Sequence, residues 1–159
     1  QPTVSGQQPG TQSPTTPAQP VGVKLSIAFL VDCSGSMAGE KLAAAKQAVA
    51  SSVQRTNDGK TEWAVLGFGG CSVWEETGFT QDPAAVVAAA QGLVATGDTP
   101  LTFSMYKAIA YVAKRARGET ARLVILCDGQ DNCSERNSVS QEEAMAGLRT
   151  IVRSVVPSR

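Results

Sequence analysis

Three oxygen-bearing side chains alternate along one short polar turn of the sequence. Asp32, Ser34 and Ser36 are each separated from the next by a single residue. A carboxylate and two hydroxyls on one face of a turn make up half of a site for a hard divalent cation, which prefers oxygen ligands. Gly35, between the two serines, allows the turn to close tightly.

Two further oxygen donors occur later in the chain. Asp128 stands in an Asp-Gly turn and would add a second carboxylate, and Thr99 lies in a loop and would add a third hydroxyl. A magnesium ion takes six oxygens at about 2.0–2.1 Å and usually keeps some waters. Five protein oxygens, some acting through water, would therefore leave one position of the shell open.

The composition excludes several classes of function. The chain has no histidine, which removes Ser-His-Asp and Cys-His catalysis and every histidine metal site. Its 14 basic side chains are balanced by 14 acidic ones, which argues against nucleic-acid binding and against a polybasic membrane surface. No apolar run approaches the roughly 18 residues of a membrane helix. We therefore expect no nucleic-acid partner and no membrane insertion within this chain.

The first part of the chain differs in composition from the rest. Residues 1–23 are rich in Pro, Thr and Gln, and no charged side chain precedes Lys24. Such a segment cannot bury enough apolar surface to offset the entropy lost on ordering. We expect residues 1–23 to form a disordered linker and residues 24–159 to form one domain, which is long enough for a single core.

Apolar runs and turn signals predict strands alternating with helices. Three continuous apolar runs are typical of strands buried on both faces: 24–31, 62–68 and 121–127. A short run over residues 71–75 is typical of a hairpin partner of the second strand. Helical spacing and capping signals predict four helices: from about 42 to 56, 83–95, 102–116 and from 140 to about 155. In the third helix, Met105, Ile109 and Val112 are expected to lie on one face.

This alternation predicts an α/β domain with an open, mainly parallel central sheet and helices on both faces. Ligands of such sheets bind beyond the carboxyl ends of the strands. Two of the predicted strands end in a carboxylate, Asp32 and Asp128. If these strands are parallel neighbours, the two carboxylates lie side by side at that edge.

The combined pattern resembles the von Willebrand factor type A domain and its metal-ion-dependent adhesion site. The matching parts are Asp32, Ser34 and Ser36 in Asp-x-Ser-x-Ser, Thr99 in Gly-x-Thr-Pro-Leu, and Asp128 in Asp-Gly. The resemblance implies that the three hydroxyls contact the ion directly or nearly so. It implies that the two aspartates hold the ion directly or through water. Mg²⁺ is the expected ion, with Mn²⁺ and Ca²⁺ as alternatives.

The resemblance also implies a function. The expected function is metal-dependent protein binding, in adhesion or scaffolding, in which an Asp or Glu side chain of a partner protein completes the shell of the ion. No bond is made or broken, so the chain is not expected to be an enzyme. Two alternatives stay open: a structural module of a surface filament or pilus-type assembly, and an accessory domain of an intracellular chelatase or ATPase complex.

Two features depart from the family pattern. Asp98 stands where the family often has glycine, and it is expected to cap the following helix or to be solvated, with a third carboxylate ligand as the alternative. The resemblance extends over residues 24–155, after which the family usually has two more strands and a closing helix. We expect either a fragment truncated at its C-terminus or a strand over residues 150–156.

Four cysteines bear on the cellular compartment. Cys71 and Cys133 both fall in loops after strands that should end at the same edge, so a bridge between them is sterically reasonable. A Cys33–Cys127 bridge ranks lower because it would distort the metal turn, and buried thiols are the alternative for these two residues. A disulfide would indicate an oxidising compartment. We expect an extracellular, cell-surface or periplasmic location, with an intracellular one as the alternative.

Overall fold

The computed structural model describes residues 22–128 and 132–133 of the chain. The described elements, in chain order, are β1 (Leu25–Asp32), a single 3₁₀ turn (Gly35–Met37), α1 (Glu40–Thr56), β2 (Thr61–Gly69), β3 (Ser72–Thr80), α2 (Pro83–Gln91), α3 (Leu101–Arg115) and β4 (Thr120–Leu126). The strands form one sheet in the order β3-β2-β1-β4. β1 pairs in parallel with both β2 and β4, and β3 joins the edge of β2 in antiparallel fashion.

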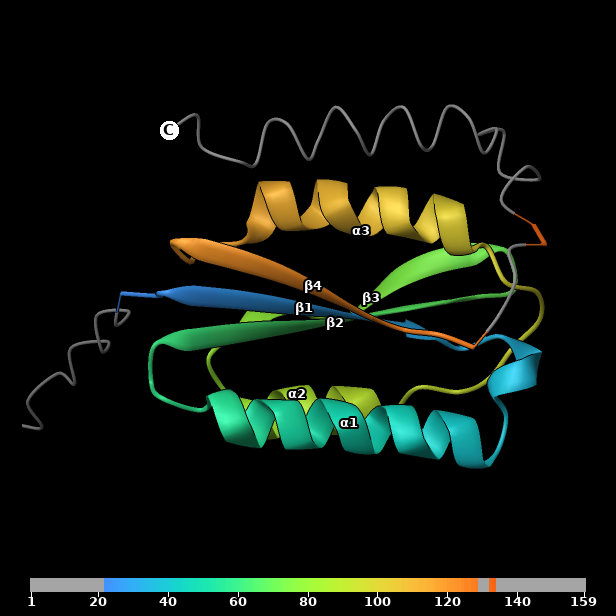
Figure 1. Cartoon of the computed structure of the whole chain (residues 1–159), viewed down its shortest axis with the longest axis horizontal. Coiled ribbons are helices and arrows are strands. Elements are labelled where there is room, and N and C mark those ends of the chain that lie inside the picture. The colour runs from blue at the N-terminus through green and yellow to red at the C-terminus, as the bar shows by residue number, and fades with distance from the viewer. Residues whose placement is uncertain (1–21, 129–131, 134–159) are drawn as a thin grey trace, which may run out of the picture.

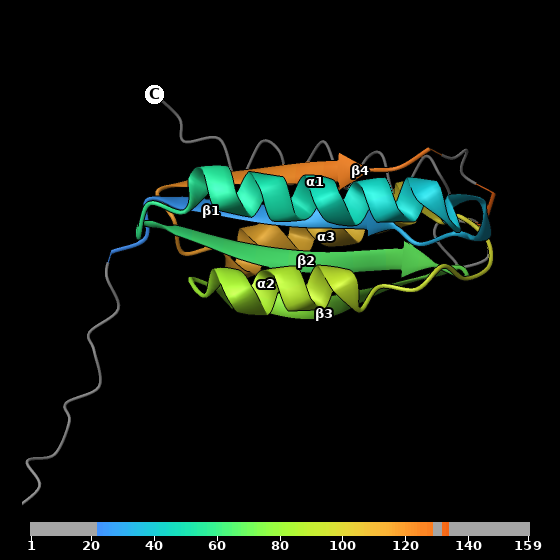
Figure 2. The same cartoon turned by 90° about the horizontal axis from the view of Figure 1, so that it is seen from below.

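The sheet lies between two layers of helices. Helices α1 and α2 cover one face, and α3 covers the other (Figures 1 and 2). The predicted α/β architecture with a mainly parallel sheet and helices on both faces is therefore confirmed. Most of the predicted linker, the helix expected from residue 140 and the alternative strand over residues 150–156 lie outside the described residues.

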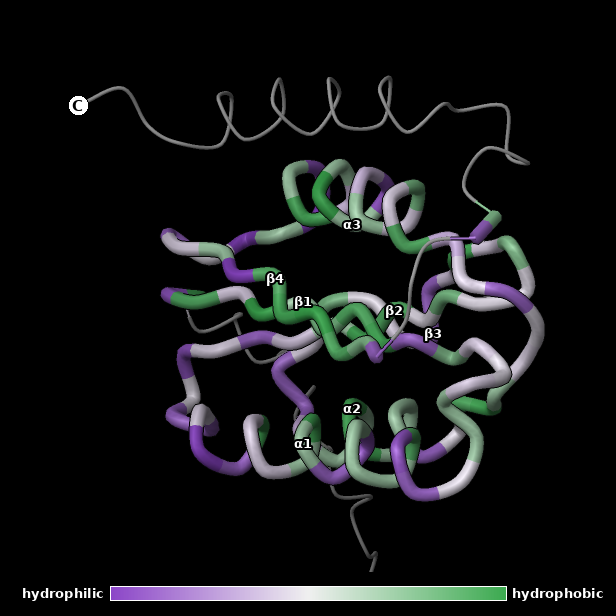
Figure 3. The backbone as a smooth tube through the Cα atoms, turned by 45° about the vertical axis from the view of Figure 1, so that its right-hand side comes forward, coloured by the Kyte–Doolittle hydropathy of each residue, from purple (hydrophilic) through white to green (hydrophobic). Residues whose placement is uncertain are grey.

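The central strand β1 is apolar from Ile27 to Val31 because both of its faces are covered. Ile27, Phe29 and Val31 belong to the core beneath α1 and α2. Ala28 and Leu30 point the other way and pack with residues of α3. Figure 3 shows the same concentration of hydrophobic residues on the inner strands. A continuous apolar run rather than an alternating one is the expected pattern for such a strand.

Two predicted boundaries were wrong. Helix α2 ends at Gln91 rather than at about residue 95, because the chain leaves the helix after Gly92 and turns Leu93 into the core, where it is 2% exposed. β3 continues to Thr80 rather than ending near Glu75, because it follows β2 through two register shifts and keeps pairing as far as Trp63.

Apolar and small side chains of α3 both contact the sheet. Val112 is buried, and Met105 and Ile109 are half-buried. Met105 packs with Ala108 against core residues of β1 and β2. The other buried positions of α3 carry small side chains: Thr102, Ser104 and Ala108.

A buried carboxylate fixes the connection between α3 and β4. Glu62, at the start of β2, is fully buried. Its carboxylate accepts hydrogen bonds from Ser26 Oγ at 2.6 Å and from the backbone N–H and Nε of Arg117, both at 2.8 Å. The N–H of Gly118 donates to Ser26 Oγ at 2.8 Å. This network ties the chain entering β4 to the amino ends of β1 and β2, and so supports the register of β4.

The Glu62 network predicts an asymmetric response to substitution. Arg117→Leu removes the guanidinium and leaves the buried carboxylate without a cation, so we expect a loss of about 3 kcal/mol in the free energy of unfolding. Glu62→Gln keeps a neutral acceptor in place and should cost about 1–2 kcal/mol. Urea unfolding of both variants measures the difference. Equal losses, or a larger loss in Glu62→Gln, would contradict this role of the ion pair.

Candidate metal centre

Three segments meet beyond the carboxyl ends of β1 and β2. The N–H of Cys33 donates to the carbonyl of Phe68 at 2.7 Å, which keeps the chain after β1 against the end of β2. The loop before α3 joins this edge, because Thr96 N–H donates to the Cys33 carbonyl and Gly35 N–H donates to the Gly97 carbonyl at 2.8 Å. The turn of residues 33–37 therefore contacts both the end of β2 and the 96–100 loop, and the N–H of Gly70 donates to the Thr96 carbonyl at 2.9 Å.

Glycine is required where these segments cross. A Cβ on Gly69 would lie 2.8 Å from the carbonyl oxygens of both Cys33 and Thr96. Gly97 has a φ of +54°, and a Cβ there would lie 2.6 Å from Cα of Gly70. The close approach of the loops, and hence the position of the predicted ligands, depends on the absence of these side chains.

Asp32 is a buried carboxylate at the end of β1, with no exposed surface. Its Oδ1 accepts a hydrogen bond from the N–H of Ser34 at 2.8 Å. Its Oδ2 is one of two buried side-chain oxygens in the described residues that have no hydrogen-bond partner, the other being Ser104 Oγ. A buried, unpartnered carboxylate oxygen is costly, and a cation at this edge would satisfy it.

Four of the predicted ligands form one hydrogen-bonded chain. Beyond the Asp32–Ser34 contact, Ser34 Oγ lies 3.1 Å from Ser36 Oγ, and Ser36 Oγ donates to Asp128 Oδ1 at 3.1 Å. Asp32 and Ser34 are buried, whereas Ser36 and Asp128 are exposed. These four hydrogen-bonded residues thus extend from the interior to the surface.

Thr99 reaches the same edge through a separate loop. It is 4% exposed, and two hydrogen bonds hold its backbone to Asn132, which follows β4. Asn132 Oδ1 accepts from Thr99 N–H at 2.7 Å, and Asn132 N–H donates to the Thr99 carbonyl at 3.0 Å. Sequence reasoning missed Asn132, since no spacing rule links a residue after β4 to the loop before α3.

Lys41 also belongs to this site and was missed. It is the second residue of α1, and its ammonium forms an ion pair with Asp128 Oδ2. The hydrogen bond from Lys41, and to a smaller degree that from Ser36, holds the pKa of the Asp128 carboxyl below its usual range. A lysine in the first turn opposes the helix dipole, and this was the signal in the sequence that could have pointed to a nearby carboxylate.

The carboxylates at this edge are few. Within residues 22–128 and 132–133, no group of three or more Cys, Asp or Glu side chains is placed to hold a metal ion. An ion at this edge would therefore depend on hydroxyl oxygens for much of its protein shell. The five predicted residues supply two carboxylates and three hydroxyls, an oxygen-only set that fits a hard divalent cation.

Asp98 is half-buried in the loop before α3. The residue at the capping position of that helix is Pro100, whose side chain forms no cap. The Asp98 carboxylate accepts a hydrogen bond from the Cys71 thiol, with Sγ 3.9 Å from Oδ2. Capping of α3 by Asp98 stays a prediction, as does its alternative role as a third carboxylate ligand.

No disulfide joins any of the four cysteines, all of which lie in the described part of the chain. The Cys71–Cys133 bridge is thus not a feature of this structure and stays a prediction. Cys33 is fully buried beside Asp32. Burial, and next the negative charge of Asp32, raise the pKa of the Cys33 thiol to about 11. Cys33 is therefore a protonated thiol at neutral pH.

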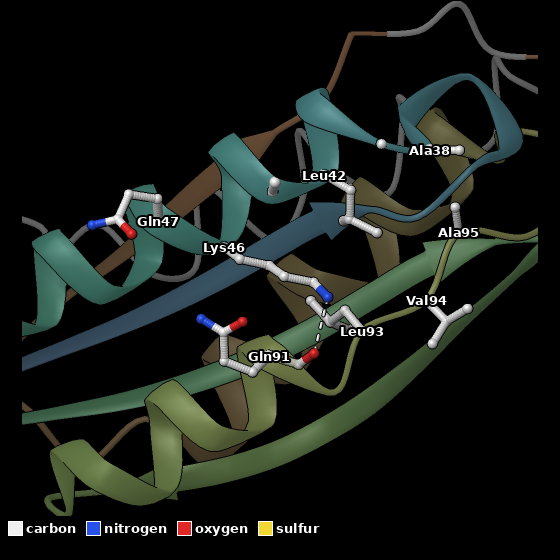
Figure 4. Close-up of a pocket in the computed structure, with 10 residues that line it drawn as sticks. Ala38, Leu42, Lys46, Gln47, Gln91, Leu93, Val94 and Ala95 are labelled. Carbon is white, nitrogen blue, oxygen red and sulfur yellow. Dashed lines mark hydrogen bonds between the residues drawn. The ribbon is translucent and has the colours of Figure 1, made fainter.

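A groove of about 540 Å³ lies apart from the predicted ligands. It runs between α1 and the chain that follows α2, with Ala38 and Ala95 at one end (Figure 4). The Lys46 side chain crosses the groove and donates to the Gln91 carbonyl at 2.9 Å. The side chains that line the groove carry no carboxylate or hydroxyl oxygen, so it is not a candidate cation site.

Among the described helices, none is both long and apolar enough to cross a membrane.

Comparison with family models matches residues 27–130 to the von Willebrand factor type A domain. The matched range contains most of β1, the turn with Asp32, Ser34 and Ser36, the 96–100 loop and Asp128. No curated protein sequence matches the chain.

Several solved structures share the fold. A von Willebrand factor type A protein from Catenulispora acidiphila is 20% identical, with a TM-score of 0.65, over 80% of this chain and 30% of that one. The pilus adhesin SpaC from Lactobacillus rhamnosus GG is 18% identical, with a TM-score of 0.58, over 71% of this chain and 15% of that one. The SpRpn10 VWA domain is 13% identical, with a TM-score of 0.57, over 86% of this chain and 84% of that one.

At these identities the likeness shows the fold alone. The chain also spans less than half the length of the two bacterial proteins. Their activities and partners therefore say nothing direct about this chain.

Because the loops cross at Gly97, we expect alanine substitution there to lower the free energy of unfolding more than substitution of Gly59, another glycine with positive φ. Gly59 has a φ of +74° with nothing within 4 Å of a built Cβ, so Gly59→Ala should cost only the left-handed backbone strain, about 1 kcal/mol. Gly97→Ala adds the collision with Gly70 and should cost about 1–3 kcal/mol more. Urea unfolding of the two variants measures the gap. Equal costs would mean that the loops separate without penalty.

Proposed function

Because the chain belongs to the von Willebrand factor type A domain family, we propose that it binds a divalent cation at the carboxyl edge of its sheet. Through that ion it binds an acidic side chain of a partner protein. We propose Mg²⁺ as the resident ion, with Mn²⁺ and Ca²⁺ as alternatives. Asp32, Ser34, Ser36, Thr99 and Asp128 are the proposed ligands.

The observation that carries this proposal is the unpartnered Oδ2 of the buried Asp32. A carboxyl oxygen that is buried without a hydrogen-bond partner costs free energy unless another group satisfies it. The hydroxyls of Ser34 and Ser36 and the Asp128 carboxylate continue from Asp32 to the surface in one hydrogen-bonded chain. A cation bound along this chain would compensate Asp32 and remain reachable from solvent.

The five proposed ligands would offer different chemical groups to an ion. Asp32, buried and oriented by the Ser34 N–H, supplies a fixed negative charge, and the three hydroxyls supply neutral oxygens. Asp128 supplies the second charge at the exposed side. When bound, the ion would supply a positive centre for a carboxylate of the partner, because two protein carboxylates leave it electrophilic. This is binding without bond cleavage, and we propose no enzymatic activity.

We propose that the protein acts outside the cytoplasm, in adhesion or in scaffolding of a surface assembly. The composition of residues 1–23, which suits a spacer, supports this location. The shared fold with a pilus adhesin is consistent with it. A structural role in a pilus-type filament, in which the ion stabilises the fold, is a second candidate that the same likeness favours.

Calorimetric titration of the chelator-treated chain with Mg²⁺ tests the site. We expect saturable binding that is lost in Asp128→Ala, because that variant removes the exposed carboxylate of the site. Glu119→Gln is the control: it neutralises a carboxylate at the opposite end of the sheet, where Glu119 pairs with Lys24, and should bind as the unsubstituted chain does. Binding that survives in Asp128→Ala would contradict the assigned site.

A second experiment separates function from stability at Asp32. In chelator, Asp32→Asn should be as stable as the unsubstituted chain within about 1 kcal/mol, or more stable, because Oδ2 of Asp32 has no hydrogen-bond partner to lose. With Mg²⁺ at about 100 times its Kd, only the unsubstituted chain should gain about 2.7 kcal/mol. Urea unfolding in both buffers measures the two effects. A large loss in chelator, or an equal Mg²⁺ gain in the variant, would show that Asp32 serves the fold rather than an ion.

A further inference from the structure

Lys41 places a positive charge on a proposed metal ligand. Its ammonium forms an ion pair with Asp128 Oδ2, while the Ser36 hydroxyl donates to Asp128 Oδ1. Both oxygens of the exposed carboxylate are therefore engaged by donors from the segment that follows β1.

The position of Lys41 in α1 is otherwise unfavourable. It is the second residue of the helix, where the backbone N–H groups carry partial positive charge and a cation is disfavoured. Its side chain is 58% exposed, so it covers little apolar surface. The contact with Asp128 is the described interaction that makes this position favourable for a lysine.

A divalent ion and the ammonium would compete for the same carboxylate. An ion that took Asp128 together with Ser34 and Ser36 would lie within a few ångströms of Lys41 Nζ, since these groups form one chain of contacts. Two positive charges at such a distance repel each other. The ion would gain the Asp128 carboxylate most favourably once the ammonium has left it.

We propose that Lys41 is a built-in competitor of the divalent ion, holding Asp128 when no ion is bound and lowering the affinity of the site for the ion. This inference rests on the proposed function. It adds that metal loading is coupled to the release of Lys41 from Asp128, so that the affinity of the site is set partly by a residue that is not a ligand.

Magnesium titration of lysine variants tests the competition. In Lys41→Gln, Mg²⁺ should bind about three- to tenfold tighter, because an exposed ion pair and a nearby positive charge no longer oppose it. Lys41→Arg keeps the charge and should stay within about twofold of the unsubstituted chain. Lys46→Gln is the matched control on the same helix, because it loses the same charge while its Nζ contacts the Gln91 carbonyl; its affinity should also stay within about twofold.

Unfolding experiments add a readout that does not depend on heats of binding. In chelator, Lys41→Gln should be slightly less stable than the unsubstituted chain, because Asp128 loses its partner. At a fixed Mg²⁺ concentration below saturation, its gain in stability should be the larger of the two. Circular dichroism of each variant establishes that it is folded.

The outcomes separate this inference from the proposed function. If the unsubstituted chain binds Mg²⁺ and Lys41→Gln binds no tighter, the competition is overturned and the metal site stands. If Lys46→Gln tightens binding as much as Lys41→Gln does, the effect is one of net charge and the competition is again overturned. If neither the unsubstituted chain nor Lys41→Gln binds Mg²⁺ or Mn²⁺, both proposals fall. Binding in Lys41→Gln alone would support the competition most strongly.

Discussion

The candidate site depends on the parallel pairing of β1 with a strand on each side. Because β2 and β4 run in the same direction as β1, the three strands deliver their carboxyl ends to one edge. Val31 is opposite Leu126, so Asp32 and Asp128 leave the sheet within one residue of the same level. A shift of β4 by one residue would move Asp128 along the edge and turn every β4 side chain to the other face. The Glu62 network, at the far end of the sheet, opposes such a shift.

Much of this arrangement could be predicted from the sequence because burial leaves a strong pattern. A strand covered on both faces must be apolar throughout, and β1 was therefore recognisable, together with the carboxylate at its end. The buried positions Leu42, Ala45, Val49 and Val53 of α1 follow helical spacing closely. The two aspartates could be placed at one edge once the strands were taken as parallel neighbours.

The parts that could not be predicted are contacts between segments distant in sequence. Asn132 binds the backbone of Thr99, and Lys41 pairs with Asp128 across 87 positions of the chain. Neither contact leaves a local pattern. The burial of the polar Thr102 and Ser104 in α3 was also not predictable, since it depends on the sheet that lies beneath the helix.

The two carboxylates of the candidate site have opposite electrostatic situations. Asp32 is covered, oriented by one N–H and left with an unpartnered oxygen, which costs free energy while no cation satisfies it. Asp128 is exposed, and both of its oxygens have donors. A structure selected only for stability would be expected to compensate the buried charge first and the exposed one last. The opposite distribution is favourable if the cation comes from solution. A cation would then satisfy the unpartnered oxygen of Asp32. Asp128, which Lys41 would have to release, would adjust the affinity of the site for the ion.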